Sequence, residues 1–359
     1  KTKITWGVSD ELAHSIMYED GLDLPTRCFQ HREPVRMSKL DMRHESGICI
    51  QSLVCAPIKT SSKTFGVMLL INRFDGEDFE QDDLDRMEML LSFVAVAIDN
   101  SHMLKSQLSQ QKIEQEMAIA RQIQETILPK NIDEVPGVEI GAVYFPAREV
   151  GGDYYDIIRV SDRAFYAIIG DVSNKGVPAA LVMSAAAGII KTLVAQSPDI
   201  SVSDLAGRVN TILSEEIIRD REMFVTLFLC RFDLAANTVS YCNAGHIPGL
   251  FWDNDNHRID QLSEGGPIVG QFPGYAFKQG ERPVASGDRL FVFTDGLTEA
   301  ADIEGNLFGR ERAEQVFSAE MGTDPKMFCI RVKEWVDRFA EGAEEDFMDD
   351  FTILQVMVK

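Results

Sequence analysis

The sequence predicts an α+β protein in which antiparallel sheets and helices are grouped along the chain. Two observations lead to this fold class. After Pro129, strand-like apolar runs and helical patterns occur in groups rather than in strict alternation. In addition, several neighbouring apolar runs have the spacing of β-hairpins, which connect antiparallel strands. The 359 residues, 45% of them hydrophobic, are enough for two domains or more.

The first region, residues 1–100, contains a predicted hairpin followed by a helix. The segment SLVCAPIKTSSKTFGVMLLINRF has two apolar runs separated by a polar turn at residues 60–63. From Asp82 a helix is predicted, with acids in its first turn, where the helix dipole favours them. The apolar residues that recur there at helical spacing are Leu84, Met87, Leu91, Val94 and Ile98.

The second region, residues 101–130, predicts one helix, because it has no glycine and only one proline, near its end. Two packing modes fit this helix. A short coiled coil would make the protein a homodimer through a seam of Ile113, Met117, Ala120, Gln124 and Ile127. Replacing Gln124 by Ile123 in that set gives instead the stripe of a single amphipathic helix that docks on a neighbouring domain. The sequence leaves both modes open.

The third region, residues 131–359, supplies most of the predicted strands and helices. Strands are expected at 138–145, 164–169, 225–232, 238–242, 289–293 and 352–358. Helices are expected at 178–194, 202–219 and 324–339.

Composition excludes several classes of partner. The net charge of −22 would repel a nucleic-acid backbone or an anionic membrane, so we expect neither as a partner. The six cysteines form no C-x-x-C pair, which indicates reduced thiols and a cytoplasmic protein. No stretch is expected to be long and apolar enough to span a bilayer. The first residue is Lys1 rather than Met, so we expect no signal peptide and a trimmed chain.

Acidic residues recur where apolar strands begin or end. Asp153 follows two glycines, Asp171 ends the run AIIGD, Asp295 follows RLFVFT, and Asp349 and Asp350 precede the last strand. Any one of them could serve only as a turn residue. Four such positions together would repel one another in a partly buried site and would require a cation. Oxygen ligands without a His or Cys cluster favour Mg²⁺ or Mn²⁺.

Other catalytic motifs are absent from the sequence. GDVSNKG lacks the G-x-x-x-x-G-K-[ST] order of a Walker loop, and neither H-E-x-x-H nor G-x-S-x-G occurs. His246, in NAGH, has two interpretations. It could be a general acid, but we expect a structural histidine that bonds a turn.

Five blocks in the third region carry a family resemblance. They are PAREVGGDYYDI, IIGDVSNKGVPAALVMSAAAGIIKTL, NAGH, FVFTDGLTEAADIEGNLFG and DDFTILQV. In this order, they resemble the bacterial sporulation and stress-response serine phosphatases, a SpoIIE-type branch of the metal-dependent protein phosphatase 2C-like family. The resemblance implies a two-layer antiparallel β-sandwich flanked by helices, with a centre of two Mn²⁺ or Mg²⁺ ions at one edge.

The resemblance also assigns roles to individual residues. Asp153 and Asp171 correspond to ligands shared by both metals, and the Val172 carbonyl assists one of them. Asp295 and Asp349 correspond to ligands of the other metal, with Asp350 as the second choice for the last position. Arg148 corresponds either to a phosphate-contacting arginine or to the structural partner of a carboxylate. Asp156, in the same GGDYYD motif, is expected to matter less.

The implied activity is hydrolysis of phosphoserine or phosphothreonine on a regulatory protein of the anti-anti-sigma kind, by water activated at two metals. Two alternatives remain open at this point. The domain could be a regulatory scaffold that binds a partner without turnover, or a phosphatase of small molecules. Manganese-dependent release of phosphate from an aryl phosphate would separate the scaffold from the enzymes.

The first region resembles a GAF sensor domain. The blocks that carry this resemblance are SLVCAPI, GVMLLINR and FEQDDLDRMEMLLSFVAVAI. They cover only its second half, and no opening helix or first strands are evident before Trp6, so we expect a domain that is incomplete at its N-terminus. The resemblance implies a small-molecule ligand and control of the phosphatase through the helical linker.

Overall fold

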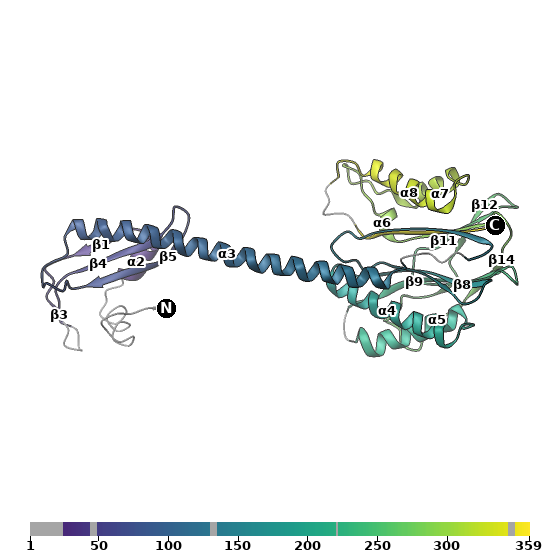
Figure 1. Ribbon diagram of the computed structural model, residues 1–359, viewed down its shortest axis with the longest axis horizontal. Helices are drawn as coiled ribbons and strands as arrows, with labels where there is room; N and C mark the ends of the chain where they lie inside the picture. The colour runs from purple at the N-terminus through teal and green to yellow at the C-terminus, as the bar shows by residue number, and fades with distance from the viewer. Residues whose placement is uncertain (1–23, 44–48, 130–134, 220–221, 344–348) are drawn as a thin grey trace. The chain divides into compact units, whose positions relative to one another are not determined.

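The computed structural model describes residues 24–43, 49–129, 135–219, 222–343 and 349–359. The chain forms two compact units that divide between Glu114 and Gln115. Helix α3 (Gln81–Ile127) contributes to both units, and Figure 1 labels it with the other elements.

The first unit is built on a three-stranded antiparallel sheet with the order β1-β4-β5. Its remaining elements are α2 (Leu24–His31), β1 (Val35–Met37), β2 (Met42–Arg43), β3 (Cys49–Ile50), β4 (Leu53–Lys59) and β5 (Thr64–Ile71). Strands β4 and β5 form the predicted hairpin around the turn at 60–63, which confirms that prediction. The predicted absence of opening elements before Trp6 lies outside the described residues.

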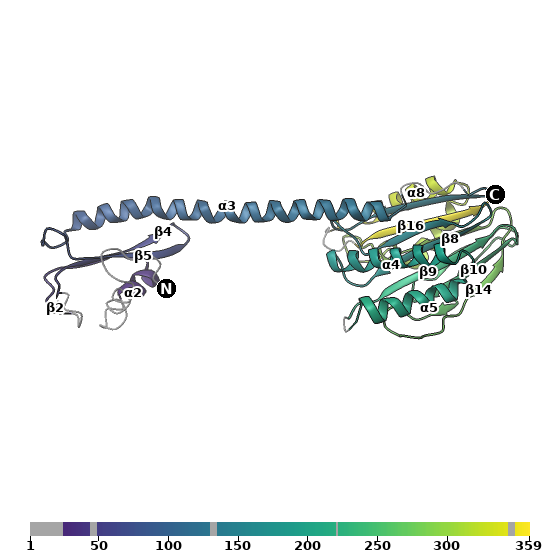
Figure 2. The same ribbon diagram turned by 60° about the horizontal axis from the view of Figure 1, so that its bottom comes forward.

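The sheet of the first unit has a helix on each face. Val54 and Ala56 of β4 pack with Leu91 of α3, whereas Leu53 packs with Leu24 of α2. Because successive residues of a strand point to opposite faces, α2 and α3 cover opposite sides of the sheet (Figure 2).

Helix α3 is uninterrupted, whereas the sequence suggested a first helix that ends near residue 100 and a separate linker helix. The two merge because no glycine or proline occurs between Gln81 and Ile127. Several large apolar side chains of α3 are exposed, among them Leu90, Phe93, Leu104, Leu108 and Ile113.

The second unit contains two antiparallel-based sheets that pack face to face. The first sheet, with the order β13-β10-β9-β8-β7 and β14 beside β10, comprises β7 (Tyr154–Arg159), β8 (Ala164–Val172), β9 (Val225–Asp233), β10 (Thr238–Ala244), β13 (Gly265–Gly266) and β14 (Gly280–Pro283). The second sheet, with the order β12-β11-β15-β16-β6, comprises β6 (Val138–Phe145), β11 (Gly249–Asp253), β12 (Arg258–Leu262), β15 (Arg289–Phe293) and β16 (Phe351–Val358).

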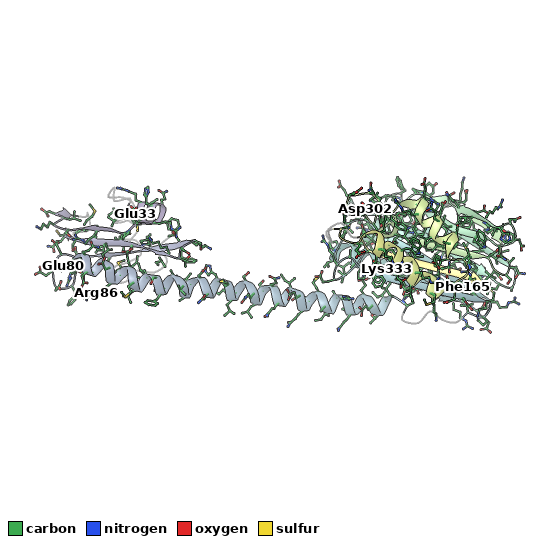
Figure 3. The ribbon with its side chains drawn as sticks, turned by 90° about the horizontal axis from the view of Figure 1, so that it is seen from above. Glu33, Glu80, Arg86, Phe165, Asp302 and Lys333 are labelled. Atoms are coloured by element: carbon green, nitrogen blue, oxygen red, sulfur yellow. The ribbon has the colours of Figure 1, made fainter. Side chains whose placement is uncertain are left out.

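The core of this sandwich lies between the two sheets. Phe165 of β8 and Phe232 of β9 stack there with their ring centroids 4.9 Å apart, and they share one buried cluster with Val292 of β15 and Leu354 of β16. Figure 3 labels Phe165 within the second unit. The predicted α+β class and the two-layer sandwich are confirmed.

Helices cover both outer faces of the sandwich (Figure 1). The first sheet is covered by α4 (Val177–Gln196) and α5 (Val202–Ile212), which continues into a π-helical turn at Leu213–Ile217. The second sheet is covered by α7 (Gly309–Ala319) and α8 (Pro325–Phe339), and the short helix α6 (Asp295–Thr298) lies next to β16.

Helix α4 corrects one expectation. By length and composition it is apolar enough to cross a bilayer, although the sequence was expected to contain no such stretch. One side of α4, including Ala179, Met183, Ala187 and Ile190, is fully buried in the core against the first sheet. Its apolar character therefore serves packing within the second unit.

Candidate metal centre

Two of the predicted acids come from neighbouring strands of the first sheet. Asp153 directly precedes β7, and Asp171 is the second-last residue of β8. These strands are antiparallel, with Tyr154 opposite Gly170, so the beginning of β7 lies beside the end of β8. The pairing therefore brings Asp153 and Asp171 to one end of this sheet.

The other two acids come from neighbouring strands of the second sheet. Asp295 begins α6 two residues after β15 ends, and Asp349 lies two residues before β16 begins. Phe293 pairs with Ile353 in an antiparallel ladder, which places the end of β15 beside the beginning of β16. The sandwich then brings the two pairs near each other, since the charges of Asp295 and Asp349 both raise the pKa of Asp171 after the larger effect of burial.

Asp153, Asp171, Asp295 and Asp349 are called the acid group below, and Asp153 is its fully buried member. Its Oδ2 atom accepts hydrogen bonds from two hydroxyls of the opposite sheet, Thr294 Oγ1 at 2.8 Å and Thr352 Oγ1 at 2.5 Å. Its Oδ1 atom is also buried but has no hydrogen-bond partner among the described residues. An ionised carboxylate oxygen without a partner is costly in a protein interior, so this atom requires a cation or a proton.

The acids raise one another's pKa values. Burial, together with the charges of Asp171 and Asp350, raises the pKa of Asp153 well above its ordinary value. Burial, followed by repulsion from Asp295 and Asp349, raises the pKa of Asp171 to about 7. For Asp295, burial and the charge of Asp349 raise the pKa to about 6. Without a cation, the surroundings of these three aspartates therefore disfavour the ionised form of their carboxyl groups.

These properties fit a hard divalent cation. The group offers only carboxylate and carbonyl oxygens, it contains a buried oxygen without a partner, and its charges repel one another. Mg²⁺ and Mn²⁺ prefer oxygen ligands of this kind, and either ion would relieve the repulsion.

Val172, the carbonyl ligand implied by the family resemblance, lies against the same loop. It is the last residue of β8, and its carbonyl oxygen faces Gly152 so closely that a Cβ there would lie 2.9 Å away. Glycine at this position therefore allows the Val172 carbonyl to lie beside the loop that carries Asp153.

Asp350, the second choice for the last ligand, is engaged differently from Asp349. Its two carboxylate oxygens accept backbone hydrogen bonds from Ala147 at 2.8 Å and from Gly152 at 2.5 Å. Asp350 therefore fastens the loop before Asp153 to the start of β16. The backbone of Asp350 also requires a glycine at position 296, because a Cβ on Gly296 would lie 2.0 Å from the Asp350 carbonyl oxygen.

Arg148 lies in the loop that Asp350 holds, and its side chain is exposed. Within the part of the chain that the structure describes, it forms no ion pair with a carboxylate. The alternative of a structural carboxylate partner therefore has no support among the described residues.

His246 is buried behind the acids. Its Nδ1 atom lies 2.8 Å from the Thr226 hydroxyl, and its Nε2 atom lies 3.1 Å from the Phe293 carbonyl oxygen. The carbonyl can only accept, so Nε2 carries the proton and Nδ1 accepts from Thr226. Burial lowers the pKa of His246 to about 4, so the ring is neutral. These contacts fit the structural role that we expected for this residue.

Comparison with known proteins identifies the family. The sequence model of the family Stage II sporulation protein E (SpoIIE) matches residues 161–359, which is more than half of the chain. The chain belongs to the SpoIIE family. The matched part includes Asp171, Asp295 and Asp349, whereas Asp153 and Arg148 precede it. A GAF domain model matches residues 5–98, which confirms the expected sensor-type domain at the N-terminus.

Known proteins similar to this chain match about two thirds of it, but the chain covers different shares of their own length. Phosphoserine phosphatase RsbU of Bacillus subtilis is 28% identical over 247 residues, which are 68% of this chain and 70% of RsbU. Protein IcfG of a Synechocystis strain is 30% identical over 67% of this chain, which spans only 41% of IcfG. The SiaA-PP2C domain of Pseudomonas aeruginosa shares the fold, with a TM-score of 0.61 and 20% identity over 70% of this chain and 99% of that domain.

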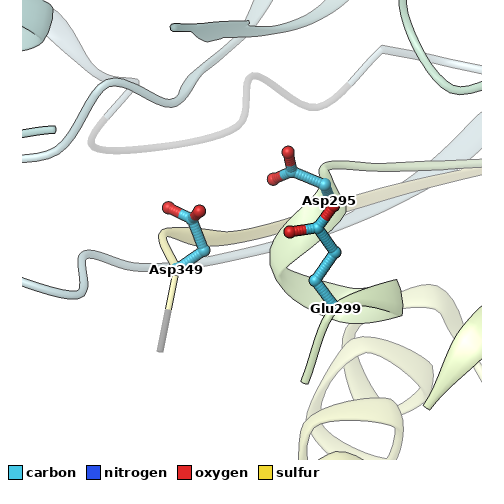
Figure 4. Close-up of side chains that lie close together, drawn as sticks. All are labelled: Asp295, Glu299 and Asp349. Carbon is cyan, nitrogen blue, oxygen red and sulfur yellow. The ribbon is translucent and has the colours of Figure 1, made fainter. Parts of the chain in front are cut away.

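The structure adds Glu299 to the acids of this SpoIIE-family domain. Asp295, Glu299 and Asp349 each offer a carboxylate oxygen within 4.8 Å of the others (Figure 4). Glu299 is exposed and lies one helical turn after Asp295. The four-residue step in TDGLTEA was the available signal, but sequence analysis did not predict a helix as short as α6.

Gln124 is a second residue whose role the sequence did not reveal. It is buried at the end of α3, where its Nε2 donates to the Gly151 carbonyl at 2.6 Å and its Oε1 accepts from the Gly151 amide at 3.2 Å. Ile127 packs against the buried cluster beside α4. Two of the five residues of the expected coiled-coil seam are thus engaged within one chain. This end of α3 docks on its own domain, but through buried Gln124, whereas Ile123, the residue expected in the docked stripe, is exposed.

Asp156, which we expected to matter less, holds a buried polar network. Its Oδ2 atom accepts from the Tyr154 hydroxyl at 2.8 Å and lies 3.1 Å from Lys191 Nζ. Lys191 Nζ also donates to the Ile127 carbonyl at 2.6 Å. Asp156 therefore connects the GGDYYD segment to the last turn of α3, which is a structural role that the sequence did not indicate.

Proposed function

We propose that this chain is a metal-dependent protein serine/threonine phosphatase, controlled by its N-terminal GAF domain. The observation that carries this proposal is the meeting of four acids, two from the strand ends of each sheet, of which Asp153 is fully buried and has a partnerless Oδ1 atom. Membership of the SpoIIE family and the likeness to phosphoserine phosphatase RsbU support the same conclusion.

The proposed ligand set follows the arrangement of the strand ends. Asp153 and Asp171 would hold both of two Mn²⁺ or Mg²⁺ ions, with the Val172 carbonyl on one ion and Asp295 and Asp349 on the other. When bound, the ions supply Lewis-acid chemistry, which lowers the pKa of water and neutralises charge on the phosphoryl group.

The chain's own residues would hold and orient these groups. The hydroxyls of Thr294 and Thr352 fix the Asp153 carboxylate from the opposite sheet. Exposed Arg148 would bind the phosphoryl oxygens of the substrate, because a guanidinium group recognises them with two donors.

The proposed substrate is a phosphorylated regulatory protein of the anti-anti-sigma type. The resemblance of the sequence motifs to stress-response phosphatases implies this substrate, and the relative RsbU, which is named as a phosphoserine phosphatase, supports phosphoserine as the group that is hydrolysed. The net charge of −22 argues against a nucleic acid or an anionic membrane as partner. The cysteines of the described part are all free, which supports a cytoplasmic location.

Control by the GAF domain would pass through α3. We propose that a small molecule binds the GAF domain and that the protein is a homodimer through this helix. An exposed apolar face of α3 supports the dimer. It is formed by side chains that are each more than half exposed and that lie on one side of the helix at 100° per residue: Leu90, Phe93, Leu104 and Leu108. This face differs from the seam first expected, whose Gln124 and Ile127 are engaged within the chain.

A direct test is phosphate release from a phosphoserine peptide and from an aryl phosphate, each with Mn²⁺ and with chelator. Metal-dependent release from both would support the proposal. Release from neither would favour the non-catalytic scaffold, and release from the aryl compound alone would favour a phosphatase of small molecules. Asp171→Asn and Asp295→Asn remove a ligand charge at nearly constant volume, and both should abolish release while the protein stays folded.

A further inference from the structure

A positively charged side chain of the protein, Lys175, lies beside the acid group. Its Nζ atom lies 3.0 Å from Asp349 Oδ2, and its charge slightly offsets the rise in the pKa of Asp295 that burial and Asp349 cause. Among the described residues, no other lysine or arginine forms an ion pair with Asp153, Asp171, Asp295 or Asp349. Lys175 thus pairs with a carboxylate that the proposed function assigns to a divalent ion.

The loop that carries Lys175 is conformationally restricted. Lys175 lies between β8 and α4, and its neighbours Asn174 and Gly176 have φ angles of 71° and 78°. Two left-handed residues in a short connection between a buried strand and a buried helix define the course of the backbone. The Lys175 side chain is 39% exposed, so it stands at the rim of the acid group and remains accessible to a ligand.

We propose that Lys175 exchanges partners during the reaction cycle: it pairs with Asp349 when no metal is bound, and it binds the phosphoryl group of the substrate when metal is bound. This inference rests on the proposed function. A divalent cation at Asp349 neutralises that carboxylate and repels the ammonium group, so metal binding weakens the ion pair.

The incoming phosphoryl group completes the exchange. A phosphomonoester brings up to two negative charges to a site in which the carboxylates already engage the metal ions. Lys175 is close to this site and has three donors on a flexible stem, which suits an oxygen-rich anion. Lys175 thus neutralises Asp349 when no metal is bound and the phosphoryl group when metal and substrate are bound.

The first arm of the test uses metal binding and needs no turnover. Lys175→Met should lower the melting temperature of the chelator-treated protein, because Asp349 loses the cation with which it pairs. It should also tighten Mn²⁺ binding severalfold by calorimetry at low ionic strength, because a competing cation is gone. Lys278→Met is the matched control, since Lys278 pairs with Glu264 at 3.9 Å and is 75% exposed. It should change neither quantity.

The second arm uses steady-state kinetics at saturating Mn²⁺ with a phosphoserine peptide. Lys175→Met should raise KM roughly tenfold with kcat nearly unchanged, and Lys175→Arg should restore most of the loss, because the charge binds substrate in the ground state. Unchanged Mn²⁺ affinity, or an unchanged KM, in Lys175→Met would overturn the exchange. If the wild-type protein released no phosphate, the proposed function would fail, while the metal-binding arm would still decide whether Lys175 competes with metal.

Discussion

The side-chain amide of Gln124 pairs with both backbone groups of Gly151, as a donor to its carbonyl at 2.6 Å and as an acceptor from its amide at 3.2 Å. Gly151 lies two residues before Asp153, the fully buried member of the acid group. The last turn of α3 is therefore bonded directly to the loop that positions a proposed metal ligand.

Replacement of Gln124 should damage both stability and turnover. Gln124→Leu leaves the buried amide and carbonyl of Gly151 without partners, which should cost about 1–3 kcal/mol for each group left unpaired. Loss of this contact should also lower kcat, because Asp153 loses part of its support. Gln122→Leu, on the exposed side of the same helix, should change neither. Thermal unfolding and phosphate release measure the two effects, and equal behaviour of both variants would contradict the coupling.

Asp349→Asn and Asp350→Asn should have distinct effects. Asp349→Asn should weaken Mn²⁺ binding strongly and change folding little, since the polar contacts of Asp349 with other described residues are those with Lys175 and the Asp350 amide. Asp350→Asn should mainly lower the melting temperature, because an amide group cannot accept from both Ala147 and Gly152. Calorimetric titration with Mn²⁺ and thermal unfolding separate the two roles. The reverse order of Mn²⁺ affinities would make Asp350 the ligand.

The metal-free protein should become less stable as pH rises. Folding raises the pKa of Asp171 to about 7 and that of Asp295 to about 6, compared with about 3.9 in an unfolded chain. The folded state thus binds more protons between about pH 4 and pH 7, so its stability is greatest at the acidic end and is lost across this interval. Melting curves from pH 4.5 to 8 should show this slope with chelator and a weaker slope in Asp171→Asn. A flat profile with chelator would contradict the assigned repulsion.

Saturating Mn²⁺ should reverse this pH dependence. Protons compete with the ion for Asp171 and Asp295, so the stabilisation by metal should grow as pH rises from about 5 to 7. The measurement is the difference in melting temperature with and without Mn²⁺ at each pH. A difference that does not depend on pH would indicate that the ion binds elsewhere.

The exposed face of α3 should determine the oligomeric state. If a second copy covers this face, Leu104→Asp combined with Leu108→Asp should give monomers, because charge replaces apolar area worth roughly 1.5–3 kcal/mol for each buried leucine. Ser106→Asp, at an exposed position between them, is the matched control and should leave the dimer intact. Light scattering distinguishes these results. A monomeric wild-type chain would show that α3 does not pair through this face.

Local sequence features predicted much of the second unit. The strand at 289–293 coincides with β15, and the strands expected at 138–145 and 352–358 correspond closely to β6 and β16. β6 and β16 have eight residues each, and β15 is apolar apart from Arg289, so these strands are recognisable from the sequence pattern alone. The strands β7, β11 and β12 and the helices α6 and α7 were not expected, because they are short or rich in polar residues and depend on their neighbours for stability.

The sequence by itself determined which acids stand at the ends of strands, since an apolar run followed or preceded by aspartate is visible in one dimension. Only the tertiary structure decided how they differ, because burial and neighbours are properties of the folded chain. Asp153 is fully buried between two threonines of the other sheet, whereas Asp350 bonds the backbone and Asp156 bonds Lys191. Gln124 illustrates the same limit: a polar residue in an apolar stripe looks like a defect until its partner, 27 residues away, is known.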